Sequence, residues 1–195
     1  KKIIERETSL LEGKDFFLGY SPERVNPGDK KHSLKKIDKI IAYPHNFRLR
    51  DVTQLYKEVS KKMIFTKNIK EAETAKVIEN IQRDVNIGLI NEIYIVCKKL
   101  NINFGNVINL ASTKWNFLKY KPGLVGGHCL PVDPYYLSYV SNLKKFKTKV
   151  ILAGRSINDN ITIYLKKNLI EKLRKIETKK KKILFCGLTY KENVS

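Results

Sequence analysis

The residues best suited to chemistry lie in one glycine-rich segment, Pro122–Pro134. Cys129 follows three glycines in this segment and precedes Asp133 by four positions. Glycines let backbone N–H groups approach a ligand closely, and a thiol beside such donors is favoured as its nucleophilic thiolate. Two interpretations fit this pattern equally well: a reactive cysteine, or a tight turn around a buried structural cysteine.

Asp133 and Pro134 predict the start of a helix. Aspartate is a preferred N-cap residue, and proline is favoured at the first helical position. Cys129 would then lie just before a helix N-terminus, where the helix dipole also favours an anion. His128 is adjacent to Cys129 but is a poor candidate for its base, because neighbouring side chains on an extended loop point apart.

A second candidate group lies on a long predicted helix, residues 69–99. Lys76, Asn80 and Arg83 are spaced at i, i+4 and i+7, which places them on one helix face. A lysine, an amide and a guanidinium in this arrangement can bind a phosphate or orient a carbonyl. A solvated polar face is the ordinary alternative, although the flanking residues here are apolar.

The elements that must position these residues follow from the periodicity of apolar side chains. Short apolar runs predict strands at residues 16–20, 39–43, 62–66 and 183–188. Helical patterns predict helices at residues 1–11, 51–61, 69–99, 104–115, 133–143 and 150–178, with Gly88 as the weak point of the third. Apolar residues recur at helical spacing along the last helix, which predicts a core face or a dimer seam.

The composition argues against several classes of protein. Three cysteines, odd in number and widely spaced, argue against a disulfide framework and a zinc site and favour the reducing cytoplasm. No apolar run approaches the roughly 20 residues that span a bilayer, and no segment resembles a signal peptide. We therefore expect a cytoplasmic protein with no metal and no membrane partner.

The formal net charge is +20, yet only seven of the 39 basic residues are arginine and the lysines are spread along the chain. This distribution favours small polyanionic ligands such as nucleotides over nucleic acid. A basic nucleic-acid-binding module and a thiol hydrolase built on Cys129 remain open as alternatives.

Four motifs, in order along the chain, resemble the UDP-glucose/GDP-mannose dehydrogenase family. They occupy residues 20–29, 71–80, 126–134 and 187–193. The first and third are most similar to the branch that oxidises UDP-N-acetylhexosamines, including the Vi-antigen and O-antigen type enzymes. The glucose-oxidising branch usually has a second glutamate where this chain has Pro27, which makes UDP-glucose the less favoured substrate.

The resemblance implies NAD-dependent oxidation of the C6 hydroxyl of UDP-N-acetylglucosamine or UDP-N-acetylgalactosamine to the uronic acid, for surface polysaccharide synthesis. UDP-N-acetylmannosamine and UDP-glucose are the alternative substrates. Cys129 would form a thiohemiacetal and then a thioester, with Lys76 and Asn80 stabilising the oxyanion. Glu23 would activate the hydrolytic water, and Asp133 would orient that water or Lys76.

Further residues that the resemblance implies would contact the nucleotide sugar, together with Lys76 and Asn80. They are Arg24, Val25, Arg83, Gly126, Tyr190 and Lys191. The NAD site would lie mostly outside this chain, because no glycine-rich dinucleotide fingerprint occurs in these residues.

The fold implied by the resemblance is α/β overall, dominated by a central all-α dimerisation domain. We expect the C-terminal part of an NAD-binding Rossmann-like domain at residues 1–68 and the start of a UDP-binding domain at 179–195. Between them, residues 69–178 would form the central helical domain with its long connecting helix. The partners would be a UDP-sugar and a second copy of the chain in a homodimer.

Overall fold

The computed structural model of the protein describes residues 1–25, 29, 31–46, 49–178 and 180–187. The chain forms two compact units, one containing Lys1–Val77 and the other Ile78–Tyr190. Each unit is described by itself below. Within the described residues, no helix is long and apolar enough to cross a membrane.

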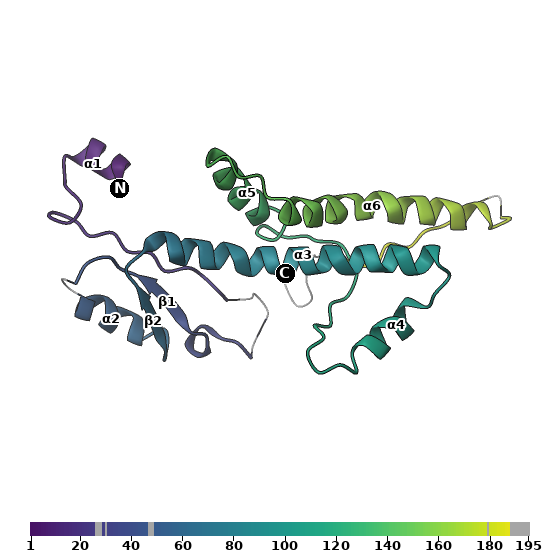
Figure 1. Ribbon diagram of the computed structural model, residues 1–195, viewed down its shortest axis with the longest axis horizontal. Coiled ribbons are helices and arrows are strands. Elements are labelled where there is room, and N and C mark those ends of the chain that lie inside the picture. Colours follow the sequence, from purple (N-terminus) through teal and green to yellow (C-terminus); the bar gives the residue numbers. More distant parts are fainter. Residues whose placement is uncertain (26–28, 30, 47–48, 179, 188–195) are drawn as a thin grey trace. The chain divides into compact units, whose positions relative to one another are not determined.

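The first unit is built around a parallel βαβ arrangement. Its elements are α1 (Lys2–Thr8), the short 3-10 helix η1 (Leu34–Lys36), β1 (Lys39–Ala42), α2 (Leu49–Lys57) and β2 (Met63–Thr66). β1 and β2 pair in parallel, with Lys39 opposite Met63 and Ala42 opposite Thr66, and α2 forms the connection between them (Figure 1). The strands predicted at 39–43 and 62–66 are therefore confirmed within one residue.

The strand predicted at residues 16–20 is reduced to isolated bridges. Tyr20 exchanges two backbone hydrogen bonds with Ala42, at N–O distances of 2.8 and 2.7 Å, and a separate bridge joins Glu12 to Phe16. An apolar run becomes a strand only where successive residues find backbone partners. Ala42, together with Ile41, Tyr43 and Ala72, forms the buried core of this unit.

The second unit is helical. α3 (Ile69–Lys99) begins in the first unit and continues into the second, which also contains α4 (Phe104–Ala111), α5 (Asp133–Leu143) and α6 (Val150–Arg174). α3 ends in a left-handed residue, Asn101 with φ 55°, and the N–H of Ile102 closes the end by donating to the Cys97 carbonyl. The predicted bounds of α3 and α5 are confirmed, and the fold class is α/β as expected.

α4 and α6 end earlier than predicted. After Ala111, the Ser112 hydroxyl donates to the Ile108 carbonyl at 2.6 Å, and residues 112–116 continue as turns. After Arg174, the N–H groups of Lys175 and Ile176 donate to carbonyls three residues earlier, which tightens and ends the helix. Residues 183–187 form no strand, since no described residue pairs with their backbone; residue 188 lies outside the described residues.

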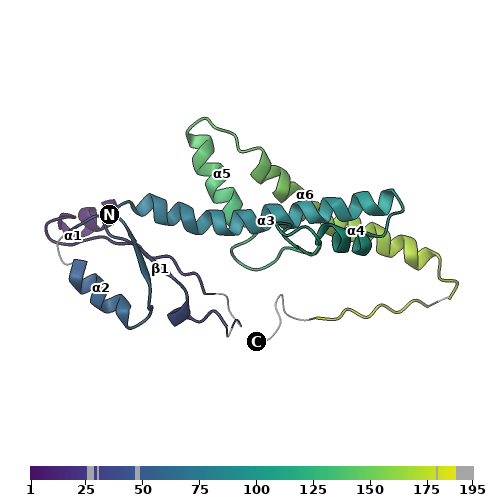
Figure 2. The ribbon, with the colours of Figure 1, turned by 60° about the horizontal axis from the view of Figure 1, so that its bottom comes forward.

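Two glycines let α6 cross α3 at very short range. A Cβ atom placed on Gly88 would lie 2.9 Å from the Gly154 carbonyl oxygen, and one placed on Gly154 would lie 3.1 Å from the Val85 Cα. α6 runs beside α3 in Figure 1 and crosses it in Figure 2. Gly88, which weakens the helix by propensity, is therefore required by the packing of the two helices.

Candidate functional site

Cys129 lies in the turn that leads into α5, with its thiol exposed. The Cys129 carbonyl accepts hydrogen bonds from the N–H groups of Val132 and Asp133 at 3.0 and 2.9 Å. Gly127, two residues earlier, has φ 88°, a conformation that glycine adopts without strain. The predicted place of the thiol just before a helix is confirmed, and its exposure argues against the buried structural cysteine.

Asp133 does not cap the helix as predicted. Val132 occupies the N-cap position with φ −110° and ψ −44°, and no side chain caps this end of α5. Asp133 is the first residue of α5, and its Oδ2 accepts a hydrogen bond from the Asn80 Nδ2 of α3 at 2.6 Å. The N-cap prediction was wrong because this carboxylate joins α5 to α3.

The three polar residues predicted to share a face of α3 differ in burial. Asn80 is only 5% exposed, Lys76 is half-buried one helical turn earlier, and Arg83 is exposed. Within the second unit, the structure therefore brings Asn80 together with Asp133 through a direct hydrogen bond. Gly126 is exposed in the loop before Cys129. Tyr190 and Lys191 lie outside the described residues.

Glu23 lies in the first unit, and its carboxylate is hydrogen-bonded by the backbone N–H groups of the two residues that follow it. Its Oε1 accepts the N–H groups of Arg24 and Val25, each at 2.6 Å. These bonds, with the positive charges of Lys39 and Lys76 as smaller contributions, hold the pKa of Glu23 below its ordinary value. The carboxylate is thus ionised at neutral pH and able to accept a proton, although a lowered pKa also makes it a weaker base.

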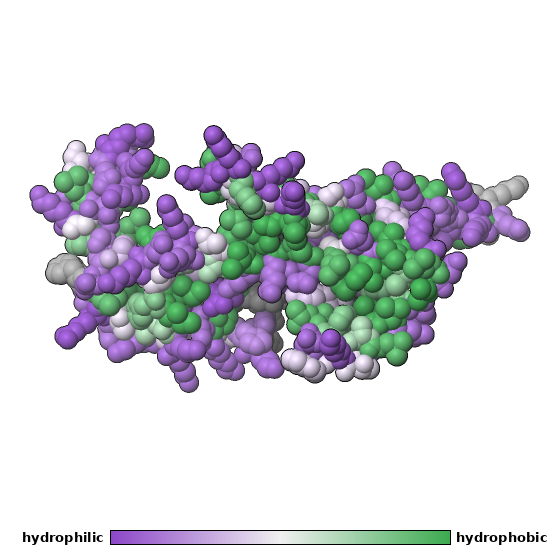
Figure 3. All heavy atoms as spheres, viewed as in Figure 1, coloured by the Kyte–Doolittle hydropathy of each residue, from purple (hydrophilic) through white to green (hydrophobic). Residues whose placement is uncertain are grey.

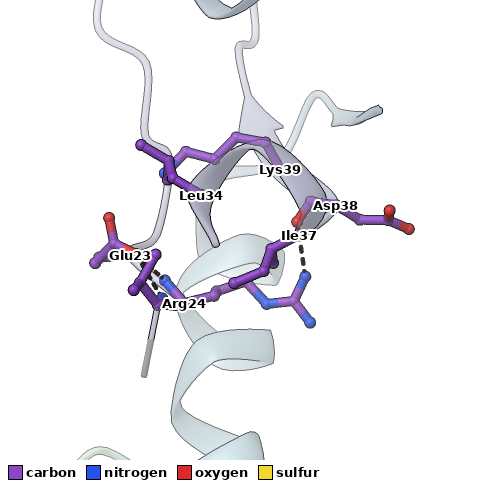
Figure 4. Close-up of a pocket in the computed structure, with 7 residues that line it drawn as sticks. Glu23, Arg24, Leu34, Ile37, Asp38 and Lys39 are labelled. Carbon is purple, nitrogen blue, oxygen red and sulfur yellow. Dashed lines mark hydrogen bonds between the residues drawn. The ribbon is translucent and has the colours of Figure 1, made fainter. Parts of the chain in front are cut away.

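Arg24 borders a small open pocket in the first unit. Figure 4 shows its guanidinium reaching the backbone carbonyl of Asp38, to which Nη1 donates at 3.0 Å. The residues lining the pocket are Glu23, Arg24, Val25, Leu34, Ile37, Asp38 and Lys39. The space enclosed there is only about 10 Å³, room for roughly one water molecule, so this pocket does not by itself hold a drug-sized ligand.

A buried polar network in the second unit was not anticipated from the sequence. Arg155 of α6 donates to Asp84 Oδ1 of α3 at 2.6 Å and also to Asp159. Asp84 is fully buried, and this burial raises the pKa of its carboxyl. Asn158 donates to both the carbonyl oxygen and Oδ1 of Asp84, each at 2.8 Å. The only sequence signal was the i, i+4 spacing of Arg155 and Asp159.

Asn91 connects this network to the glycine-rich segment. Its Nδ2 donates to the Gly123 carbonyl at 3.0 Å and to the Asn158 Oδ1 at 2.9 Å. In return, the Gly123 N–H donates to the Asn91 Oδ1 at 2.8 Å. The segment that carries Cys129 is therefore hydrogen-bonded to α3 on both sides of the thiol, through Gly123 and Asp133.

Residues 70–160 match the central domain of the UDP-glucose/GDP-mannose dehydrogenase family. This match confirms the resemblance that the four sequence motifs predicted. Among its relatives, Protein CapL of Staphylococcus aureus is 47% identical over 194 residues, covering 98% of this chain and 46% of the relative. The UDP-N-acetyl-D-glucosamine 6-dehydrogenase of Salmonella typhi is 44% identical over the same shares of both chains.

Solved structures show the same fold. The UDP-D-ManNAc dehydrogenase from Pyrococcus horikoshii superimposes with a TM-score of 0.78 at 34% identity, over 89% of this chain and 41% of that one. The chain spans about half the length of the curated relatives it matches.

Proposed function

We propose that the protein containing this chain oxidises the C6 hydroxyl of a UDP-N-acetylhexosamine to the uronic acid. The observation that carries the proposal is the exposed Cys129 thiol at the start of α5, beside the Asn80–Asp133 hydrogen bond. UDP-N-acetylglucosamine or UDP-N-acetylgalactosamine is the favoured substrate. The sequence identities support these substrates over UDP-N-acetylmannosamine. The chain is 44% identical to a UDP-N-acetyl-D-glucosamine 6-dehydrogenase and 34% identical to a UDP-D-ManNAc dehydrogenase.

The thiol and a water molecule supply the covalent chemistry in this proposal. A first loss of hydride from C6 and of the hydroxyl proton converts the alcohol to the aldehyde. The Cys129 sulfur then attacks the aldehyde carbon, forming a C–S bond and an oxyanion that takes up a proton as the thiohemiacetal. Loss of hydride from C6 and of the hydroxyl proton gives the thioester. Water then attacks the acyl carbon, the C–S bond breaks, and the products are the carboxylate and the free thiol. Overall the alcohol loses four electrons and gains one oxygen atom from water.

Four side chains assist these steps. Lys76 donates to the oxyanion and Asn80 supplies a neutral donor beside it, since the two lie one turn apart on α3. Glu23 takes the proton of the attacking water as a general base, and its lowered pKa keeps it ionised for that role. Asp133 orients the water or Lys76. The residues proposed to contact the nucleotide sugar are those given by the motifs: Arg24, Val25, Lys76, Asn80, Arg83, Gly126, Tyr190 and Lys191.

NAD is the proposed acceptor of the two hydrides. In dinucleotide-binding folds the pyrophosphate rests on a glycine-rich turn between a strand and a helix. The connection from β1 to α2 spans residues 43–48 and contains no glycine, so it does not provide that turn. We therefore assign no NAD contact to the described residues and place the cofactor site mostly outside this chain.

We also propose a homodimer formed through the helical unit, which would be the central domain at residues 69–178. Figure 3 shows a face on which apolar residues gather over α3, α4 and α6. Exposed apolar side chains of these helices include Leu89, Val96, Leu110, Ile163, Leu169 and Ile170. Apolar surface of this extent is typical of an interaction site. Light scattering on the purified protein should give twice the mass of one subunit.

The flanking segments, 1–68 and 179–195, are proposed as parts of the NAD-binding and UDP-binding domains. We propose a cytoplasmic location, because all three cysteines are unpaired, and a role in supplying surface polysaccharide precursors. No observation favours the thiol hydrolase or the nucleic-acid-binding module.

Assay of NADH formation by the whole protein tests the activity. UDP-N-acetylglucosamine, UDP-N-acetylgalactosamine, UDP-N-acetylmannosamine and UDP-glucose should be compared at equal concentration. We expect the first or second to give the highest kcat/KM, with two NADH formed per sugar. Absence of NADH with all four sugars would overturn the proposal.

A further inference from the structure

The glycine-rich segment is fixed at its start by a single side chain. Asn91 makes two hydrogen bonds to Gly123, one to its carbonyl and one from its N–H, at 3.0 and 2.8 Å. A primary amide offers both a donor and an acceptor, so the Asn91 side chain pairs with both the C=O and the N–H of Gly123, as the backbone of a neighbouring strand would. Gly123 therefore has a defined position although it is exposed and, apart from its chain neighbours, no atom of the described residues lies within 4 Å of where its Cβ would be.

The orientation of the Asn91 amide is itself determined by the buried network. Asp84 offers only acceptors to Asn158, whose Nδ2 donates to it twice, so the Asn158 Oδ1 must point the other way. That oxygen accepts from the Asn91 Nδ2 at 2.9 Å. Because the Asn91 Nδ2 must face Asn158, the Asn91 Oδ1 faces the Gly123 N–H and accepts its hydrogen bond. The exposed fractions of Asp84, Asn91 and Asn158 are 0%, 0% and 4%, so water does not compete for the hydrogen bonds among these three side chains.

The far end of the segment is held by the same helix. Asn80 donates to Asp133, and Asn80 and Asn91 are eleven residues apart on α3, a rise of about 16 Å. The ten peptide units from Gly123 to Asp133 could extend about 33 Å. The segment is therefore slack between its two attachment points, and loss of either attachment would release the thiol that lies between them.

We propose that Asn91 is a positioning residue for Cys129. It fixes the Gly123 backbone and thereby limits the places that the thiol can occupy before α5. The catalytic meaning of this inference rests on the proposed function, whereas the structural effect on the loop does not. Asn91 itself touches no reacting atom.

Hydrogen exchange and thiol alkylation of the whole protein test the inference without any substrate. In Asn91→Ala, amides of residues 123–132 should exchange about tenfold faster or more, because two hydrogen bonds to one backbone residue are lost. The rate of Cys129 alkylation by iodoacetamide, read from its own peptide by mass spectrometry, should change at least severalfold. Amides in the middle of α3 and α6 should keep their wild-type protection.

Asn86→Ala is the matched control. Asn86 also lies on α3, and among the described residues its amide donates only to the Gln82 carbonyl, so its loss should leave the loop unchanged. Asn91→Ser retains a hydroxyl and leaves room for a water molecule, and it replaces Asn91→Ala if that variant does not fold. Wild-type loop exchange and alkylation in a folded variant would overturn the inference and reduce Asn91 to a helix-packing residue.

Kinetics then separate this inference from the proposed function. In Asn91→Ala we expect kcat for NADH formation to fall at least tenfold with the KM for NAD unchanged, because the thiol is misplaced and the cofactor site is intact. If the wild-type protein oxidises no UDP-sugar but the loop still loosens, the proposed function fails and the positioning role stands. If activity is present and kcat is unaffected in a variant with a loosened loop, the positioning role fails.

Discussion

The polar residues of the second unit fall into two regions that differ in how they are satisfied. Around Cys129, side chains are exposed or joined by one contact, as in the Asn80–Asp133 hydrogen bond. At the crossing of α3 and α6, Asp84 and Arg155 are buried and each makes at least two hydrogen bonds, although Asp84 Oδ2 and Arg155 Nε have no hydrogen-bond partner among the described residues. A group that must meet a substrate needs free bonding capacity, whereas a buried group without partners is costly. Substitutions should therefore affect activity in the first region and stability in the second.

The largest effect is expected from Cys129→Ser. A serine hydroxyl at this position is a far weaker nucleophile than a thiolate, so release of the uronic acid by the whole protein should stop. The free energy of unfolding should stay within about 0.5 kcal/mol of wild type, since the side chain is exposed. Product analysis by mass spectrometry and urea denaturation measure the two quantities. Undiminished acid production would remove Cys129 from the mechanism.

Arg155→Ala should have the opposite profile. It leaves the Asp84 carboxylate buried without its cation, which typically costs about 3–5 kcal/mol of unfolding free energy. Arg174→Ala, at the exposed end of the same helix, is the control and should change stability by less than about 0.5 kcal/mol. Equal effects of the two substitutions would show that burial of the pair does not matter.

Lys76→Ala tests whether α3 contributes directly to the reaction. If Lys76 donates to the oxyanion, kcat should fall by about 10²–10³ with little change in stability. Lys70→Ala, exposed in the first turn of α3, should retain wild-type kcat. A rise in the KM for the sugar with kcat unchanged would instead mean that Lys76 only binds substrate.

Gly88→Ala should cost about 1–3 kcal/mol, because the new methyl group would overlap the Gly154 carbonyl and force the helices apart. Gly123→Ala is the control, since its methyl group would enter open space. Thermal unfolding followed by circular dichroism distinguishes them. If Gly88→Ala were as stable as wild type, the two helices would be farther apart at residue 88 in solution than in this structure.

The smallest effect concerns Glu23. Its folded-state pKa is lowered, chiefly by the Val25 N–H, so its contribution to stability is present above the ordinary pKa and is lost as the pH falls through the lowered value. NMR titration of the Glu23 carboxyl carbon should give a midpoint below 4.5, the ordinary value for this group. A midpoint at or above 4.5 would mean that the two backbone bonds are not kept in solution.

The long helices and the place of Cys129 could be predicted because their signals are local. α3 is an uninterrupted helical pattern, and the Asp133–Pro134 pair marks the start of α5 within one residue. The strand expected at 16–20 failed because an apolar run gives no information on its hydrogen-bonding partner. The N-cap role of Asp133 failed because its partner, Asn80, lies 53 positions away in sequence.

The buried network could not be predicted for a related reason. Asparagine is a residue type that usually lies on the exposed face of a helix. Asn91 and Asn158 are buried because Gly88 and Gly154 let the two helices approach closely. Residues 67 positions apart thus complete each other's hydrogen bonds. No periodicity within one helix carries that information.

The contact between Gly88 and Gly154 also has an evolutionary consequence. Either glycine alone is difficult to replace, but a first alanine that moves the helices apart would lower the cost of the second, so their effects on stability should be less than additive. The same displacement would stretch the bonds between Asp84 and Asn158, each of which lies about one helical turn from the glycine on its own helix. A substitution at either glycine would therefore change the effect of substitutions at Asp84 and Asn158. The four positions should evolve together as one epistatic group.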